Sequence, residues 1–129
     1  MAKPIFLIED DIDHAELITT FLKVGGIEDE ILWFKDAEST IEKIKEIISN
    51  RLDVPEIIII DLKLPRMDGF QLISYIRNID ILSKVPIIVI SSSSQPSDIT
   101  KAFESGAEEF INKLAEIDSL AMKVKRLIK

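Results

Sequence analysis

Two runs of consecutive apolar residues constrain the fold of this chain more than any other feature. Residues 56–61 read Glu-Ile-Ile-Ile-Ile-Asp, and residues 85–91 read Val-Pro-Ile-Ile-Val-Ile-Ser. A strand with one face in water alternates apolar and polar side chains, whereas these runs are apolar at nearly every position. Strands of this kind belong to parallel sheets that helices cover on both faces. The sequence therefore predicts an α/β fold.

Strand-like and helical segments alternate along the whole chain. The predicted strands cover residues 4–9, 31–34, 56–61, 85–91 and 108–112. Apolar residues at helical spacing follow each strand, over residues 15–22, 41–48, 70–79, 96–106 and 117–128. We therefore expect one doubly wound α/β domain over residues 1–129, with five parallel strands, five helices on both faces of the sheet and no output domain.

Several residues mark where the predicted helices begin and end. Asp11 and Asp13 are expected to act as N-caps of the first helix, and Asp36 as the N-cap of the second. Pro96 suits the first turn of the fourth helix, and Gly106 suits its end.

Composition excludes several classes of function. The chain has no cysteine and a single histidine, His14, so disulfides, thiolate sites and multi-histidine metal sites are excluded. His14 is expected to be a polar position of the first helix rather than a ligand. The net charge of −7 argues against nucleic acid as a partner. No run approaches the roughly 18 apolar residues of a membrane span, so a cytoplasmic protein without a membrane partner is expected.

Acidic residues stand where two of the predicted strands end. The first strand ends at Glu9 and Asp10, and the third ends at Asp61. Ligands of open parallel sheets bind beyond the carboxyl ends of the strands, so neighbouring strands would bring these acids together. Two carboxylates about 5 Å apart repel by roughly 3 kcal/mol at an effective dielectric near 20. Such a cluster needs a cation within it, and oxygen ligands suit Mg²⁺.

A hydroxyl and an ammonium group follow at the ends of the last two strands. Ser91 closes the fourth strand and Lys113 follows the fifth. A phosphoryl group beside a metal ion is stabilised by one hydrogen bond of this kind and one positive charge. The order of acid pair, acid, hydroxyl and ammonium indicates phosphoryl chemistry.

Four motifs in this order resemble the receiver domain of two-component response regulators, of the stand-alone single-domain type. They are LIEDD (7–11), IIIIDLKLPRMDG (57–69), PIIVIS (86–91) and SGAEEFINK (105–113). The resemblance spans roughly residues 4 to 128. It implies the strand order 2-1-3-4-5 of the flavodoxin-like receiver fold.

The resemblance also implies a role for each residue of the site. Asp61 would be the phosphoacceptor and a Mg²⁺ ligand, together with Asp10, the backbone carbonyl of Lys63 and, through water, Glu9.

Further roles concern the catalytic lysine, the conformational switch and the lifetime of the phosphoryl group. Lys113 takes the place of the invariant lysine, Ser91 that of the switch hydroxyl and Phe110 that of the switch aromatic residue. Lys63 and Ser93 would tune the lifetime of the phosphoryl group.

One position departs from the family pattern. The family usually has a cis proline after the lysine, whereas Leu114 follows Lys113 here. A non-proline cis bond costs roughly 3 kcal/mol, so a trans bond is expected. This change and the loop DLKLPRMDG (61–69) are similar to stand-alone receivers paired with bacterial phytochrome-type kinases.

The resemblance implies phosphorelay signalling rather than ordinary enzymatic turnover. A sensor histidine kinase or a histidine phosphotransfer protein would phosphorylate Asp61, and the domain would catalyse only its own phosphorylation and dephosphorylation. A protein target, or a second copy of the chain, would bind the fourth helix, fifth strand and fifth helix.

Three alternatives compete with this hypothesis. A phosphatase of the haloacid dehalogenase type needs a second acid where Lys63 stands, and a flavin binder needs a hydroxyl-rich loop where residues 9–11 are acidic. The third alternative is a constitutive, phosphorylation-independent receiver-fold module that only binds proteins, which the change at Leu114 favours.

Overall fold

Five strands and five α-helices alternate in a computed structural model that describes residues 3–93 and 95–128. Residues 1, 2, 94 and 129 of the predicted domain lie outside the described part. The order is β1 (Ile5–Ile8), α1 (Ile12–Val24), β2 (Ile31–Phe34), α2 (Ala37–Asn50), β3 (Ile57–Asp61), α3 (Gly69–Arg77), η1 (Asp80–Leu82), β4 (Ile87–Ser91), α4 (Pro96–Ser105), β5 (Glu109–Asn112), η2 (Ile117–Ser119) and α5 (Leu120–Leu127), where η marks a 3₁₀ turn. The predicted alternation of strands and helices is confirmed.

The five strands form one parallel sheet in the order β2-β1-β3-β4-β5. This is the expected 2-1-3-4-5 order of a flavodoxin-like fold. Strand β1 lies between β2 and β3, so the strand order reverses beside it. Ligand sites of such sheets lie at this reversal, beyond the carboxyl ends of the strands.

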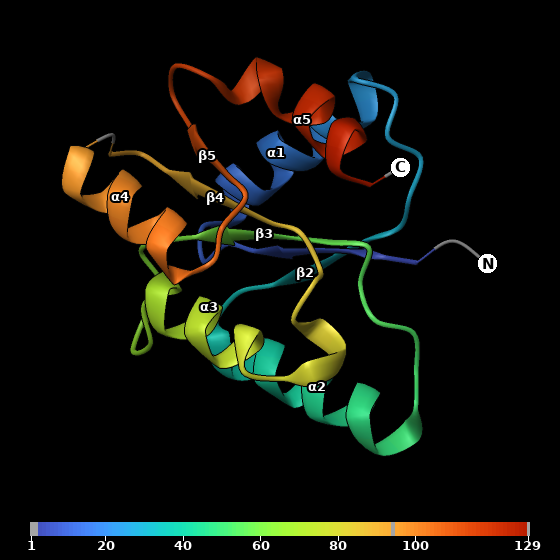
Figure 1. Cartoon of the computed structure of the whole chain (residues 1–129). Coiled ribbons are helices and arrows are strands. Elements are labelled where there is room, and N and C mark those ends of the chain that lie inside the picture. The colour runs from blue at the N-terminus through green and yellow to red at the C-terminus, as the bar shows by residue number, and fades with distance from the viewer. Residues whose placement is uncertain (1–2, 94, 129) are drawn as a thin grey trace.

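Helices cover both faces of the sheet (Figure 1). Helices α1 and α5 pack on one face, where they share an apolar core with alternate residues of β1, β3 and β4. Helices α2, α3 and α4 pack on the other face. Every residue of β3 and β4 is buried, which explains why both strands are apolar at consecutive positions.

The ends of the helices follow local capping chemistry. The Asp11 carboxylate accepts hydrogen bonds from the backbone N–H groups of Asp13 and His14, and the Asp36 carboxylate caps α2. The predicted caps at Asp11 and Asp36 are therefore confirmed, whereas Asp13 lies within the first turn of α1 and does not cap it. Gly106 ends α4 with a φ of 118°, a conformation that strains residues with a Cβ atom.

Two helices are shorter than the residue ranges over which the apolar pattern predicted them. Helix α3 ends at Arg77 rather than at Ile79, because the Asn78 side chain donates to the Ser74 carbonyl at 2.8 Å and a 3₁₀ turn follows. The last helical segment begins as a 3₁₀ turn, and α5 starts only at Leu120. Apolar periodicity does not distinguish such turns from an α-helix.

Arg77 fastens the end of α3 to the loops before β4 and β5. Its guanidinium group donates to the carbonyl oxygens of Val85 and Gly106, each at 2.8 Å. It also donates to the Glu108 carboxylate at 2.9 Å. The Arg77 side chain therefore links three segments: the end of α3, the loop before β4 and the loop before β5.

Candidate functional site

The carboxyl ends of β1 and β3 bring three carboxylates together. One oxygen atom each of Glu9, Asp10 and Asp61 lies within 4.8 Å of the other two. Glu9 and Asp61 are buried, and Asp10 is exposed. Oxygen ligands at this spacing, with one side open to water, fit a hard divalent cation. The cluster expected from the strand ends is therefore present.

Lys113 reaches this cluster from the end of β5. Its Nζ atom lies 2.6 Å from Glu9 Oε1 and 2.8 Å from Asp61 Oδ2, and the residue is buried. The acid cluster was expected to need a metal cation, but Lys113 itself already supplies one positive charge. Three carboxylates and one ammonium still leave two negative charges when all are ionised. The site therefore remains suited to a divalent metal ion.

Burial and neighbouring charges shift the pKa values of both buried partners. The pKa of Glu9 is raised to about 7, because burial and the nearby Asp61 carboxylate raise it by more than the hydrogen bond from Lys113 lowers it. Burial lowers the pKa of Lys113, but its hydrogen bonds to Asp61 and Glu9 outweigh this and raise the pKa above its usual value. Lys113 is therefore a cation at neutral pH.

The loop after β3 holds Asp61 in place. The backbone N–H of Lys63 donates to Asp61 Oδ1 at 3.1 Å. Gly69, at the start of α3, packs so closely behind the strand that a Cβ atom there would lie 2.7 Å from the Asp61 carbonyl oxygen. Arg66 ties the loop to α2 through ion pairs with Asp36 and Glu38.

The remaining predicted site residues lie around this cluster. Ser91, at the end of β4, is buried, and its hydroxyl oxygen accepts from the Ser93 N–H at 3.1 Å. Phe110 lies in β5 with its side chain buried in the core beside α4. The side chain of Lys63 is exposed, and Ser93 is partly buried.

Asn112 stabilises the loop in which Leu114 replaces the usual proline. Its side-chain carbonyl accepts from the backbone N–H groups of Leu114 at 2.8 Å and Ala115 at 2.9 Å. The expected trans bond is confirmed, since the described residues contain no cis peptide bond. The Leu114 side chain is 80% exposed. Lys113 therefore reaches the site without a proline after it.

Two contacts of the site were not predicted from the sequence. His14 Nδ1 lies 3.0 Å from Lys113 Nζ, and the Trp33 indole donates to the Glu9 backbone carbonyl at 2.7 Å. His14 lies four residues after Asp10, which places it near the site, but its contact with Lys113 depends on how the start of α1 lies beside the turn after β5. Nothing in the sequence indicated the Trp33 contact.

Acids and a lysine at this edge of a 2-1-3-4-5 sheet define a receiver-type site. The family model of the response regulator receiver domain matches residues 5–125, so the chain belongs to this family. A receiver domain is a signalling domain rather than a conventional enzyme, and its homologues are two-component response regulators.

Individual relatives share about a quarter to a third of their residues with this chain. The sensory transduction protein BceR of Halalkalibacterium halodurans is 30% identical over 97% of this chain and 49% of its own length. The phosphorylated cyanobacterial phytochrome response regulator RcpA is 26% identical with a TM-score of 0.81, over 98% of this chain and 91% of that one. The bacteriophytochrome response regulator RtBRR is 26% identical with a TM-score of 0.85, over 98% and 78%. This chain spans about half the length of several curated relatives.

Each described helix is too short or too polar to cross a membrane.

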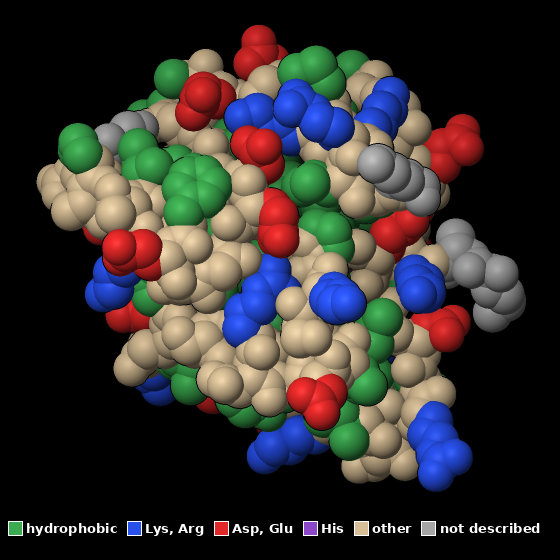
Figure 2. Space-filling view, in the orientation of Figure 1, with side chains coloured by type: hydrophobic (Ala, Val, Ile, Leu, Met, Phe, Trp, Pro, Cys, Tyr) green, Lys and Arg blue, Asp and Glu red, His purple; other side chains and the backbone are tan. Residues whose placement is uncertain are grey.

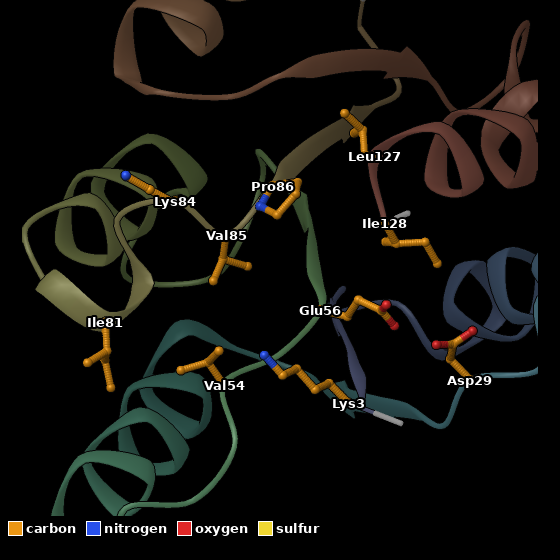
Figure 3. A pocket seen from close by; sticks show the side chains of 10 residues that line it. All are labelled: Lys3, Asp29, Val54, Glu56, Ile81, Lys84, Val85, Pro86, Leu127 and Ile128. Carbon is orange, nitrogen blue, oxygen red and sulfur yellow. The ribbon is translucent and has the colours of Figure 1, made fainter. Parts of the chain in front are cut away.

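A surface pocket lies at the opposite end of the sheet, where β1, β3 and β4 begin (Figure 3). Apolar side chains such as Val54 and Ile128 share its wall with charged ones. The Glu56 and Asp29 side chains point toward one another, and Lys3 lies on the same wall. A hydrogen bond with Asp29, burial and the charge of Asp29 raise the pKa of Glu56 to about 7.

The raised pKa of Glu56 predicts that this pair destabilises the fold as pH rises. A carboxyl group whose pKa is higher in the folded state contributes stability below its unfolded pKa, and this is lost as pH rises through the folded value. The Glu56→Gln variant should therefore lose less stability than the wild type between pH 5 and pH 8 and be the more stable protein at pH 8. Urea denaturation followed by Trp33 fluorescence measures this.

Glu28→Gln, one residue from Asp29 and exposed, is the matched control for removal of one charge. Equal pH dependence in Glu56→Gln and the wild type would contradict the raised pKa of Glu56.

Proposed function

We propose that this chain accepts a phosphoryl group on Asp61 from a phosphohistidine of a sensor histidine kinase or histidine phosphotransfer protein. A carboxylate oxygen of Asp61 forms the new P–O bond while the P–N bond breaks, and the electron pair of that bond returns to the donor imidazole. The observation that carries the proposal is the contact of buried Asp61 with Lys113 beside two further acids.

The residues of the cluster would have separate roles in metal binding and in stabilising the charge of the phosphoryl group. Asp61, Asp10 and the Lys63 backbone carbonyl would hold Mg²⁺, with Glu9 acting through a water molecule. When bound, Mg²⁺ supplies positive charge to the phosphoryl oxygens. Lys113 supplies a second positive charge from a fixed position, so the domain promotes its own phosphorylation by positioning and electrostatics.

Ser91 and Phe110 would convert the modification into a change of surface. The Ser91 hydroxyl would move toward the phosphoryl group and donate a hydrogen bond to it. Phe110 would then move into the space that the Ser91 side chain leaves. One new hydrogen bond and one repacked side chain would then shift a two-state equilibrium. Lys63 and Ser93 flank the site and would tune the lifetime of the phosphoryl group.

The surface of α4, β5 and α5 is the proposed output. Phe103 on α4 and Met122 on α5 are exposed apolar residues. Hydrophobic side chains gather near α4 and β5, and Lys and Arg side chains gather near α5 (Figure 2). A protein target, or a second copy in a homodimer, would bind here. The net charge of −7 favours a protein over nucleic acid.

A cytoplasmic location would give the chain access to the kinase. Similarity to two phytochrome response regulators supports a kinase of the phytochrome type.

Treatment with acetyl phosphate and Mg²⁺, followed by intact mass measurement, tests the proposal. The wild type should gain one phosphoryl group, and Asp61→Asn should gain none, because an amide is not a nucleophile here. Asp68→Asn is the matched control, since Asp68 lies in the same loop but caps α3, and it should still be modified. An unmodified wild type would favour the constitutive protein-binding module, and a modified Asp61→Asn variant would refute the role of Asp61.

A further inference from the structure

His14 contacts the proposed catalytic lysine, but the proposed transfer gives it no role. Its Nδ1 atom lies 3.0 Å from Lys113 Nζ. The same ammonium donates to Glu9 Oε1 and Asp61 Oδ2. An ammonium group has three N–H donors and no acceptor. His14 Nδ1 must therefore be the acceptor of the third hydrogen bond, which places the imidazole proton on Nε2.

The surroundings of the ring agree with this tautomer. The Asp11 carboxylate lies 4.0 Å from His14 Nε2, on the side where the proton is assigned, and Glu9 Oε1 lies 3.8 Å from Nδ1 but already accepts from the Lys113 ammonium at 2.6 Å. Asp11 also accepts from the backbone N–H of His14 at 3.2 Å, so the residue is fixed at the capped start of α1. The imidazole is thus presented to Lys113 by a defined element of the fold.

The three hydrogen-bond acceptors of Lys113 have different roles in the proposed reaction. Glu9 and Asp61 belong to the proposed metal site, and Asp61 also receives the phosphoryl group. His14 belongs to neither set. It is therefore the one of these three acceptors that stays available to Lys113 while the other two change partners.

Lys113 also depends on such an anchor because of the chain that follows it. The next residue, Leu114, is 80% exposed, and the turn is held by local hydrogen bonds in which the Asn112 and Glu116 side chains accept from backbone N–H groups of the turn itself. We propose that His14 is a positioning residue, which holds the Lys113 ammonium beside Asp61 during phosphorylation. This inference rests on the proposed function.

Two substitutions separate the hydrogen bond from the shape of the ring. His14→Phe keeps a ring but has no acceptor at the position of Nδ1. His14→Asn carries a carbonyl oxygen the same number of bonds from Cα as Nδ1. With acetyl phosphate and Mg²⁺ in excess, the Phe variant should be phosphorylated about 3- to 10-fold more slowly, and the Asn variant should return to within about 2-fold of the wild type.

These variants are expected to fold, because the His14 side chain is 42% exposed. Thermal denaturation checks this.

The tautomer gives a second readout that needs no phosphorylation. The chain has one histidine, so its imidazole ¹⁵N signals belong to His14 alone. At pH 8 without metal, we expect a proton on Nε2 and a hydrogen-bonded, unprotonated Nδ1. In Lys113→Met, the Nδ1 signal should shift toward that of an imidazole without this bond. A proton on Nδ1 in the wild type would overturn the inference.

The two readouts distinguish failure of the inference from failure of the proposed function. A wild type that takes up no phosphoryl group overturns the proposed function, and this role falls with it. A wild type that is phosphorylated at the same rate as His14→Phe overturns the role of His14 alone. Slow phosphorylation of both the Phe and Asn variants would also overturn it, since a restored hydrogen-bond acceptor would then not restore the rate.

Discussion

Lys113→Met is expected to lower the free energy of unfolding by about 3–5 kcal/mol at pH 7.5 in the absence of divalent metal. The substitution removes the cation that lies 2.6 Å from Glu9 and 2.8 Å from Asp61, and both carboxylates stay buried. An unpaired buried charge is far less stable than a paired one. Urea denaturation, followed by the fluorescence of Trp33, measures the loss.

The pH dependence of this variant follows from Glu9. The pKa of Glu9 is already raised to about 7 by burial, with Lys113 opposing the shift. Without Lys113 that pKa rises further, so the stability of the variant should fall as pH increases from about 5, where the protonated carboxyl group is favoured. Mg²⁺ should restore part of the loss at pH 7.5, because a ligand that binds only the folded state stabilises it.

Lys123→Met is the matched control for the loss of a lysine. Lys123 pairs with Glu109 at 3.2 Å, and both side chains keep contact with water. Partly exposed pairs contribute about 0–1 kcal/mol, so this variant should remain close to the wild type. A Lys113→Met variant as stable as Lys123→Met would show that the buried carboxylates do not depend on the ammonium.

Arg77→Met is expected to lower the free energy of unfolding by about 2–4 kcal/mol. Its guanidinium side chain is only 17% exposed and donates to the Val85 and Gly106 carbonyl oxygens and the Glu108 carboxylate. Removing it leaves partly buried acceptors without their donor, each at a cost of about 1–3 kcal/mol when water cannot replace it. Thermal and urea denaturation should agree on the loss.

Arg126→Met, on the exposed side of α5, is the control for loss of a guanidinium group. It should change the unfolding free energy by no more than about 0.5 kcal/mol. Equal stability of the two variants would mean that the links from α3 to the loops before β4 and β5 contribute little.

Local sequence patterns determined the elements of this protein and the edge of the sheet where its site lies. The unbroken apolar runs of β3 and β4 required cover on both faces. Glu9, Asp10 and Asp61 could be grouped in advance because the carboxyl ends of neighbouring parallel strands meet at one edge. Asp11 and Asp36 carried their capping signals in the residue type itself.

Only the tertiary structure decided the further contacts of the site and the exact ends of the helices. The contact of His14 with Lys113 joins residues 99 positions apart, and it depends on how the start of α1 lies beside the turn after β5. The end of α3 depends on Asn78, and its attachment depends on Arg77, although the apolar pattern continues past both. Periodicity records which face of an element is buried, but hydrogen bonds between elements depend on distances that exist only after packing.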